Sequence, residues 1–229
     1  SVFGTTAVFV AMPMGYVLLG LSIAAMVVAS AAAVYQSDLR RLLAYSSVAQ
    51  IGYITLGISF ASATGLTGGI VHLFNHGVTK GALFMFAGAI AFRLGSLRID
   101  RMAGLARSMP LTCAGIVVGG LGLIGVPGTA GFITKWYLVL AAIEAGAWWI
   151  AFVVVASSLI AVAYVWRFVE AAYFRPPADD VARLKEAPAA LLVPAAVLLF
   201  ASVYFGIDPS MPLGAAAEDS APAETTVAT

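Results

Sequence analysis

Charged side chains in this 229-residue chain are confined to short segments that separate long apolar runs. Five runs contain no Asp, Glu, Lys or Arg: residues 1–37, 42–79, 108–134, 145–166 and 187–207. Each is long enough for the roughly 20 residues that a membrane-spanning helix needs. The runs are rich in Ala, Leu, Val and Gly and lack the alternation of barrel strands. Because backbone in hydrocarbon must satisfy its own hydrogen bonds, the pattern predicts transmembrane helices.

The predicted fold class is all-α integral membrane protein, with about six spans. They are placed at residues 11–35, 42–60, 65–92, 110–140, 148–173 and 188–207. Residues 1–207 are thus expected to form one transmembrane helical domain, and residues 208–229 a flexible acidic tail. The first apolar run has no basic flank and is too long for a secretory signal. The chain also starts without Met, so we expect a processed chain or one piece of a longer polypeptide.

Basic side chains gather in alternate connections between these spans. Arginines and lysines follow the first, third and fifth predicted spans, whereas no basic residue follows the second, fourth or sixth. The positive-inside rule makes the basic connections cytoplasmic. We therefore expect a multi-pass protein of the cell inner (plasma) membrane with both termini outside.

Composition further limits the binding partners and the kinds of site that this chain can have. Apolar and aromatic residues make up 62% of the chain, charged residues 10%, and the formal net charge is +1. Such a balance offers no basic surface for nucleic acid. A single cysteine, Cys113, excludes a disulfide framework and a thiolate metal cluster within this chain.

A stripe of titratable residues lies inside the third predicted span. Lys80 falls near its middle, where an ammonium ion costs roughly 2.5–3.5 kcal/mol or more. His72, His76 and Lys80 are spaced by four residues, so they share one helix face and rise about 6 Å per step. Because imidazole titrates near physiological pH, the stripe predicts a proton relay. Two alternatives stay open: a zinc site, for which the spans offer no third acidic or Cys ligand, and polar residues that only join helices.

A second lysine follows an expected break in the fourth span. The residues that disrupt helical hydrogen bonding there are Gly125, Pro127, Gly128 and Gly131. Non-helical backbone at membrane depth persists only where protein or water covers it, and discontinuous helices form ion sites in transporters. We expect Lys135 to begin the second half-helix, where the positive end of the helix dipole opposes its charge. A kink used only for packing is the alternative.

The second span adds Ser46, Gln50 and Tyr53 at i, i+4 and i+7. This polar stripe is expected to hold water beside the lysine helices, although hydrogen bonds between packed helices explain it equally well. Arg167 and Glu170 lie near a span end, where they are expected to snorkel or to pair with each other.

Three motifs now resemble one family. Residues 38–53 read Asp-Leu-Arg-Arg-Leu-Leu-Ala-Tyr-Ser-Ser-Val-Ala-Gln-Ile-Gly-Tyr, residues 72–84 read His-Leu-Phe-Asn-His-Gly-Val-Thr-Lys-Gly-Ala-Leu-Phe, and residues 125–135 read Gly-Val-Pro-Gly-Thr-Ala-Gly-Phe-Ile-Thr-Lys. In this order they resemble the proton-conducting transporter family, the antiporter-like membrane subunits of respiratory complex I, membrane hydrogenases and Mrp-type Na⁺/H⁺ antiporters. The amino-acid sequences of these motifs look most similar to those of a D-type Mrp subunit.

The resemblance implies a fold of about fourteen helices built from two inverted repeats, each with a broken helix. This chain is similar to helices nine to fourteen only, so another membrane subunit or an upstream segment must supply the first repeat. By position, Lys80 looks like the central lysine of the family's eleventh helix, His72 and His76 like the histidines of the connecting relay, and Lys135 like the lysine of the broken twelfth helix. We expect the two lysines to pair, with the histidines extending the line toward the absent repeat.

The leading functional hypothesis is an ion-translocating subunit of a multisubunit monovalent cation/proton antiporter. The second is the same architecture in a redox-driven pump of the NADH:quinone oxidoreductase or membrane hydrogenase type, and the third is an inert scaffold. We expect no redox or hydrolytic site, no cofactor and no metal in this chain. The expected partners are other membrane subunits, the lipid bilayer, protons and, for antiport, Na⁺.

Overall fold

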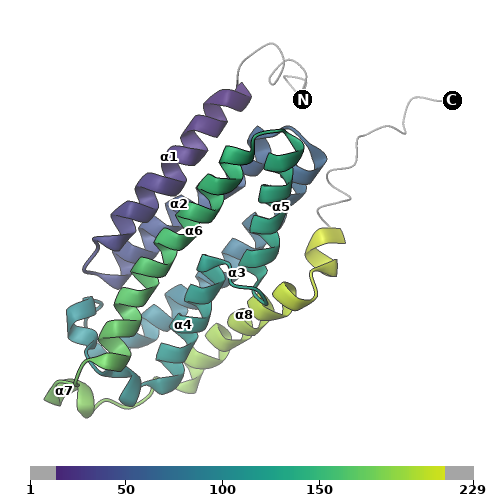
Figure 1. Cartoon of the computed structure of the whole chain (residues 1–229). Helices are drawn as coiled ribbons and strands as arrows, with labels where there is room; N and C mark the ends of the chain where they lie inside the picture. The colour runs from purple at the N-terminus through teal and green to yellow at the C-terminus, as the bar shows by residue number, and fades with distance from the viewer. Residues whose placement is uncertain (1–13, 215–229) are drawn as a thin grey trace.

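The computed structural model describes residues 14–214, which are almost entirely helical (Figure 1). The long helices are α1 (Met14–Val34), α2 (Leu39–Ser59), α3 (Ala63–Leu94), α6 (Trp148–Val169) and α8 (Ala189–Ile207). Two 15-residue helices, α4 (Pro110–Ile124) and α5 (Ala130–Glu144), lie between α3 and α6. The short elements are the 3₁₀ turns η2 (Ile99–Met102) and η3 (Leu105–Arg107), the π-helical turn η4 (Glu170–Phe174) and the one-turn helix α7 (Asp179–Ala182).

The predicted all-α membrane architecture is confirmed. Within the described residues, 5 helices are long and apolar enough to cross a membrane, the α6–η4 segment counting as one. The remaining span, the fourth of the six predicted, corresponds to α4 and α5, which a non-helical segment separates. The chain is therefore a multi-pass membrane protein whose fourth span is broken.

Local sequence sets the helix boundaries. Asp38 caps the start of α2, where its side chain accepts a hydrogen bond from the Arg40 amide, and Ser62 caps α3 through the Gly65 amide. Gly95 ends α3 in the left-handed conformation that glycine adopts without strain. Pro110 opens α4, where its missing amide proton has no consequence.

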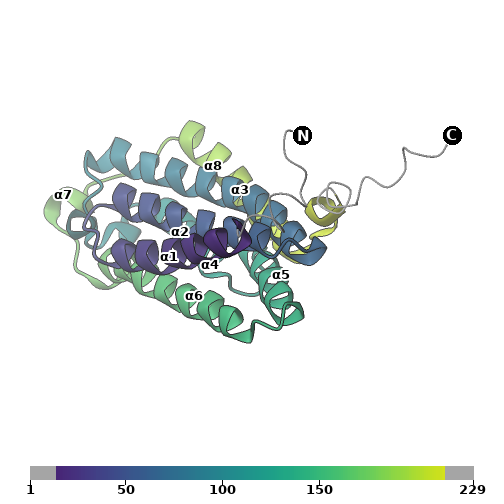
Figure 2. The same ribbon diagram turned by 90° about the horizontal axis from the view of Figure 1, so that it is seen from above.

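Helix α3 is the axis around which the others pack. At 32 residues it is about 48 Å long, and it contacts α2, α4, α5 and α8. Figure 2 shows it between α2 and α8, with α1 beyond α2. Its approach to α2 depends on small residues, because a Cβ at Gly57 would lie 2.5 Å from the Gly65 carbonyl oxygen. This close packing brings the α2 polar stripe against the α3 titratable stripe.

The three basic connections interlock at one end of the bundle, the end that carries α7 in Figure 1. The segments that follow α1 and α3 join through the Leu39 amide, which donates to the Leu97 carbonyl at 2.8 Å. The segments that follow α3 and α6 join through an ion pair between Arg101 and Asp180 at 2.7 Å. The clustering expected from the sequence is thus present, and the membrane side of this end stays a prediction.

One smaller expectation is corrected. Arg167 does not pair with Glu170: its guanidinium donates to the Val34 and Gln36 carbonyls, which lie at the end of α1 and lack helical partners. Glu170 pairs instead with Arg175. Of the predicted tail, only residues 208–214 are described, and residues 210–214 are helical. The rest of the tail and both termini lie outside the described residues.

Cysteine labelling tests the topology. Residues 61 and 96 lie in the α2–α3 and post-α3 connections, at opposite ends of the bundle, and the native Cys113 is fully buried. We expect a membrane-impermeant maleimide to label Ala61→Cys from outside intact cells and Ser96→Cys only in inverted vesicles. Labelling of both from one side would contradict the arrangement.

Candidate functional site

Lys80 is bound to the backbone of the neighbouring helix. The side chain is 5% exposed, and its Nζ donates to the Leu43 carbonyl at 2.8 Å and to the Ser46 hydroxyl at 2.5 Å, both on α2. Charge-assisted hydrogen bonds contribute about 1.5–3 kcal/mol each, comparable to the roughly 2.5–3.5 kcal/mol that a charge at the bilayer centre costs on insertion scales. Two bonds therefore make a buried ammonium tolerable here without a carboxylate.

His72 has a hydrogen-bond partner at each ring nitrogen. Its Nε2 lies 2.9 Å from Gln50 Oε1, and its Nδ1 lies 2.8 Å from the Thr134 hydroxyl. That hydroxyl also lies 3.0 Å from the Gly131 carbonyl oxygen, so its single proton has two acceptors. It donates to Nδ1 when the imidazole is neutral and accepts from Nδ1 when the imidazole is charged. The site can therefore hold His72 in either protonation state.

Lys135 reaches back across the break. Its Nζ donates to the Leu123 and Ile124 carbonyls, each at 2.8 Å, which belong to the last turn of α4 and lack helical partners. The ammonium thus lies at the negative end of the α4 dipole. The expectation that Lys135 begins the second half-helix and faces a positive dipole is wrong, because it lies one and a half turns into α5.

Glycine makes this return geometry possible. Gly125 ends α4 with a φ of 86°, and a Cβ there would lie 2.9 Å from the Lys135 side chain. A Cβ at Gly131 would clash with the Gly122 carbonyl oxygen. Gly206 of α8 packs against Thr129, so protein covers that part of the break, while Pro127 and Gly128 are exposed in this chain. The predicted interruption is confirmed at residues 125–129, whereas Gly131, which was expected to belong to it, lies in the first turn of α5.

The titratable side chains form one line through the bundle. The Tyr53 ring lies 4.8 Å from Lys135 Nζ and 5.4 Å from the His72 ring. The His72 and His76 rings are stacked 6.4 Å apart, and Lys80 follows His76 one turn along α3. The histidines thus lie between the two lysines rather than beyond them. The sequence could not predict this order, because it depends on how α5 folds back beside α3.

His76 differs from the other members of the line. Its Nδ1 is buried and has no hydrogen-bond partner within the described part of the chain. The neighbouring Asn75 donates to the Ala130 carbonyl at 3.3 Å, but its Oδ1 is likewise unpartnered. An unsatisfied buried polar atom costs about 1–3 kcal/mol. We therefore expect water or a group from another subunit to complete this position.

Sequence reasoning missed several polar side chains of the site. They are Asn75, Thr79, Thr134, Ser157 and Ser202, all of them buried. Asn75 and Thr79 follow His72 by three and seven residues, so helical periodicity could have found them. The others bind across helices: Ser157 meets the Tyr53 hydroxyl at 2.5 Å, and Ser202 meets Thr79 at 2.7 Å. No local signal identifies such partners.

The two alternatives to a proton relay are a metal site and side chains that only join helices. No group of three or more His, Cys, Asp or Glu side chains that could hold a metal ion occurs among the described residues. Helix joining accounts for His72, whose two nitrogens bind α2 and α5. It does not account for the unpartnered His76 nitrogen or for two buried ammonium groups.

Comparison with known sequences gives the family. Residues 2–161 match the family described as NADH:quinone oxidoreductase/Mrp antiporter, transmembrane region. The chain belongs to this family. The resemblance inferred from the three motifs is thereby confirmed.

The curated relatives in this family include both of its branches. The chain is 42% identical over 188 residues to NADH-quinone oxidoreductase subunit N of Desulforudis audaxviator, an alignment covering 76% of this chain and 37% of the relative. It is 34% identical over 188 residues to a probable K⁺/H⁺ antiporter protein of Rhizobium meliloti, covering 80% of this chain and 19% of the relative. The chain therefore spans well under half the length of these relatives, and they do not single out the expected D-type Mrp subunit.

Solved structures agree with this family. A chain of the Mrp complex from Dietzia sp. DQ12-45-1b superimposes with a TM-score of 0.84 and 25% identity, covering 90% of this chain and 46% of that one. A chain of respiratory complex I from Thermus thermophilus gives 0.80 and 27%, covering 90% and 44%. Both neighbours are subunits of multisubunit membrane complexes.

A single added methyl group tests the break. Gly131→Ala would place its Cβ against the Gly122 carbonyl oxygen, and overpacking of this kind typically costs about 1–3 kcal/mol. We expect a lower thermal midpoint of the detergent-solubilised complex. Gly20→Ala on α1 is the matched control, because its Cβ meets nothing within 4 Å. Equal midpoints for the two variants would show that α4 and α5 do not meet as described.

Proposed function

We propose that this chain is a membrane subunit that translocates protons along the line formed by Lys80, His76, His72 and Lys135. The observation that carries the proposal is the presence of two buried lysine amines with two stacked imidazoles between them, and with no carboxylate among their described partners. A helix-joining role needs no such charges, because neutral polar groups join helices at lower cost.

Electrostatic repulsion couples the protonation of neighbouring groups on the line. Two positive charges 6.4 Å apart, the separation of the His72 and His76 rings, repel by about 2.6 kcal/mol at an effective dielectric constant of 20. A proton arriving at one imidazole therefore disfavours a second proton on its neighbour. Protonation of Lys80 or Lys135 biases the adjacent imidazole in the same sense, so charge passes along the line in steps.

The bonding around His72 supports transfer in particular. Thr134 supplies a hydroxyl that serves either protonation state, and Gln50 fixes the opposite nitrogen. A proton can therefore arrive and leave without a buried nitrogen losing its partner, which keeps the barrier to each step low. Transfers longer than one hydrogen bond require water in the line.

The driving reaction would come from other subunits. Identity of 42% to an NADH-quinone oxidoreductase subunit N supports a redox-driven complex, and identity of 34% to a probable K⁺/H⁺ antiporter protein supports cation/proton antiport as the second candidate. In either case we propose a plasma-membrane location, with other membrane subunits of the complex as partners.

Alanine substitution of the lysines tests the relay. Lys80→Ala and Lys135→Ala are expected to reduce proton transport by inverted vesicles at least tenfold while the complex still assembles, because each removes an end of the line. Arg183→Ala, in the exposed α7 connection, is the control and should transport normally. If both lysine variants assemble and transport at the wild-type rate, the chain is an inert scaffold in this respect.

Purification separates the two driving reactions. Affinity isolation of the complex in mild detergent is expected to bring down iron–sulfur or flavin subunits, detected by their absorbance and metal content, if the complex is redox-driven. A preparation that lacks both and exchanges K⁺ or Na⁺ for protons in proteoliposomes would favour antiport instead.

A further inference from the structure

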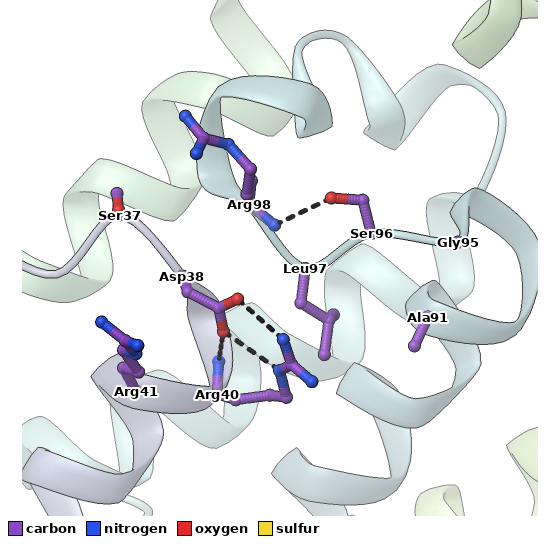
Figure 3. Close-up of a pocket in the computed structure, with 9 residues that line it drawn as sticks. All are labelled: Ser37, Asp38, Arg40, Arg41, Ala91, Gly95, Ser96, Leu97 and Arg98. Atoms are coloured by element: carbon purple, nitrogen blue, oxygen red, sulfur yellow. Dashed lines mark hydrogen bonds and ion pairs between the residues drawn. The ribbon is translucent and has the colours of Figure 1, made fainter.

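A polar pocket of about 470 Å³ opens at the basic end of the bundle, between the start of α2 and the segment that follows α3. Its volume falls within the range of small-ligand sites, about 300–1,000 Å³. The polar residues that line it are Ser37, Asp38, Arg40, Arg41, Ser96 and Arg98. Figure 3 shows the Asp38–Arg40 pair in the centre of this group, with Arg41 beside it on α2 and Arg98 on the facing segment.

Backbone hydrogen bonds hold the two walls of the pocket together. The Leu39 amide donates to the Leu97 carbonyl at 2.8 Å, and the Ile99 amide donates to the Ser37 carbonyl at 2.9 Å. The arginines therefore project from a fixed frame rather than from a free loop, which lowers the entropy cost of binding a ligand.

Positive charge is in excess around the pocket. Arg40 binds Asp38 through Nε at 3.2 Å and Nη2 at 3.0 Å, and these bonds hold the pKa of Asp38 below its usual range. Among the residues that line the pocket there are thus one carboxylate and three arginines. Arg98 forms an ion pair with Asp100, whereas Arg41 has no ion-pair partner among residues 14–214. The Arg40 and Arg98 side chains remain 68% and 61% exposed, so their remaining donors are free for a ligand.

We propose that this pocket binds the phosphate group of an anionic phospholipid at the membrane surface. Arginine is suited to phosphate because its planar guanidinium can donate two parallel hydrogen bonds. Arg41 has no ion-pair partner for this fork, while Arg40 and Arg98, whose Nε and Nη2 already bind carboxylates, add positive charge and their remaining donors. The proposal is independent of the proton line and would stand if that line failed its test.

The helix faces below the pocket favour a lipid over free phosphate. Ala91 and Gly95, which line the pocket, continue down α3 to Gly88 and Phe84 at helical spacing, and both of these are exposed. Gly88 leaves open space, because a Cβ there would meet nothing within 4 Å. On α2, Arg41 continues in the same way to the exposed Tyr45 and Val48. A headgroup in the pocket would thus have an apolar path for its acyl chains.

Lipid titration of the assembled complex tests the proposal. The detergent-purified complex is titrated with fluorescent phosphatidylglycerol and with phosphatidylcholine, which carries no net charge. We expect phosphatidylglycerol to bind more tightly, and the Arg41→Gln and Arg98→Gln variants each to weaken it about fivefold. Arg183→Gln, an exposed arginine on the same end of the bundle, is the matched control and should change nothing. Equal binding of both lipids, or equal loss in the control, would overturn the proposal.

Competition identifies the source of the phosphate. Inorganic phosphate and glycerol phosphate, added at millimolar concentration, should not displace phosphatidylglycerol if the acyl chains contribute. Full displacement would mean that the pocket takes a free phosphate and would overturn the lipid assignment. Arg41→Gln should leave subunit composition unchanged on size exclusion. Loss of a partner subunit with unchanged lipid binding would assign the pocket to an acidic segment of that partner instead.

Discussion

The cost of placing an ammonium ion inside the bundle is the constraint on which the rest of this structure depends. Lys80 and Lys135 both meet it in the same way, by donating to backbone carbonyls rather than to carboxylates. For Lys80 the carbonyl belongs to α2, whose Ser46 hydroxyl completes the pair of acceptors. For Lys135 the two carbonyls are free to accept a hydrogen bond only because α4 ends within the bundle. Neutral acceptors leave each positive charge uncompensated, which keeps it responsive to neighbouring charges.

The interruption of α4 and the close packing of the helices together place hydrogen-bond acceptors and neighbouring polar groups around the buried lysines. Gly125 lets α4 end and gives the Lys135 side chain its return path, and Gly131 lets α5 lie against α4. Gly57 and Gly65 bring α2 against α3, so that Gln50 reaches His72. The glycines therefore set the distances between the titratable groups although none of them carries any chemistry itself.

Sequence patterns predicted the elements of this site better than their order. Helical spacing placed His72, His76 and Lys80 on one face, and the glycine–proline cluster located the break, because both signals are local. The position of Lys135 beside Tyr53 and His72 depends on the fold-back of α5, which no spacing encodes. The sequence did not predict Thr134, Ser157 and Ser202 as site residues for the same reason. It did not predict the exposed arginine pocket either, because two connections that are distant in the sequence form it together.

The measurement that tests this account most directly is an electron cryo-microscopy map of the assembled complex that resolves water molecules around His76. Its buried Nδ1 lacks a partner within the described residues of this chain, although it lies between His72 and Lys80 on the proposed line. We expect a water or a polar group of another subunit within about 3.2 Å of that nitrogen, in a hydrogen-bonded chain that continues to Lys80. An apolar side chain or a lipid tail against His76, with no water between the two lysines, would contradict it.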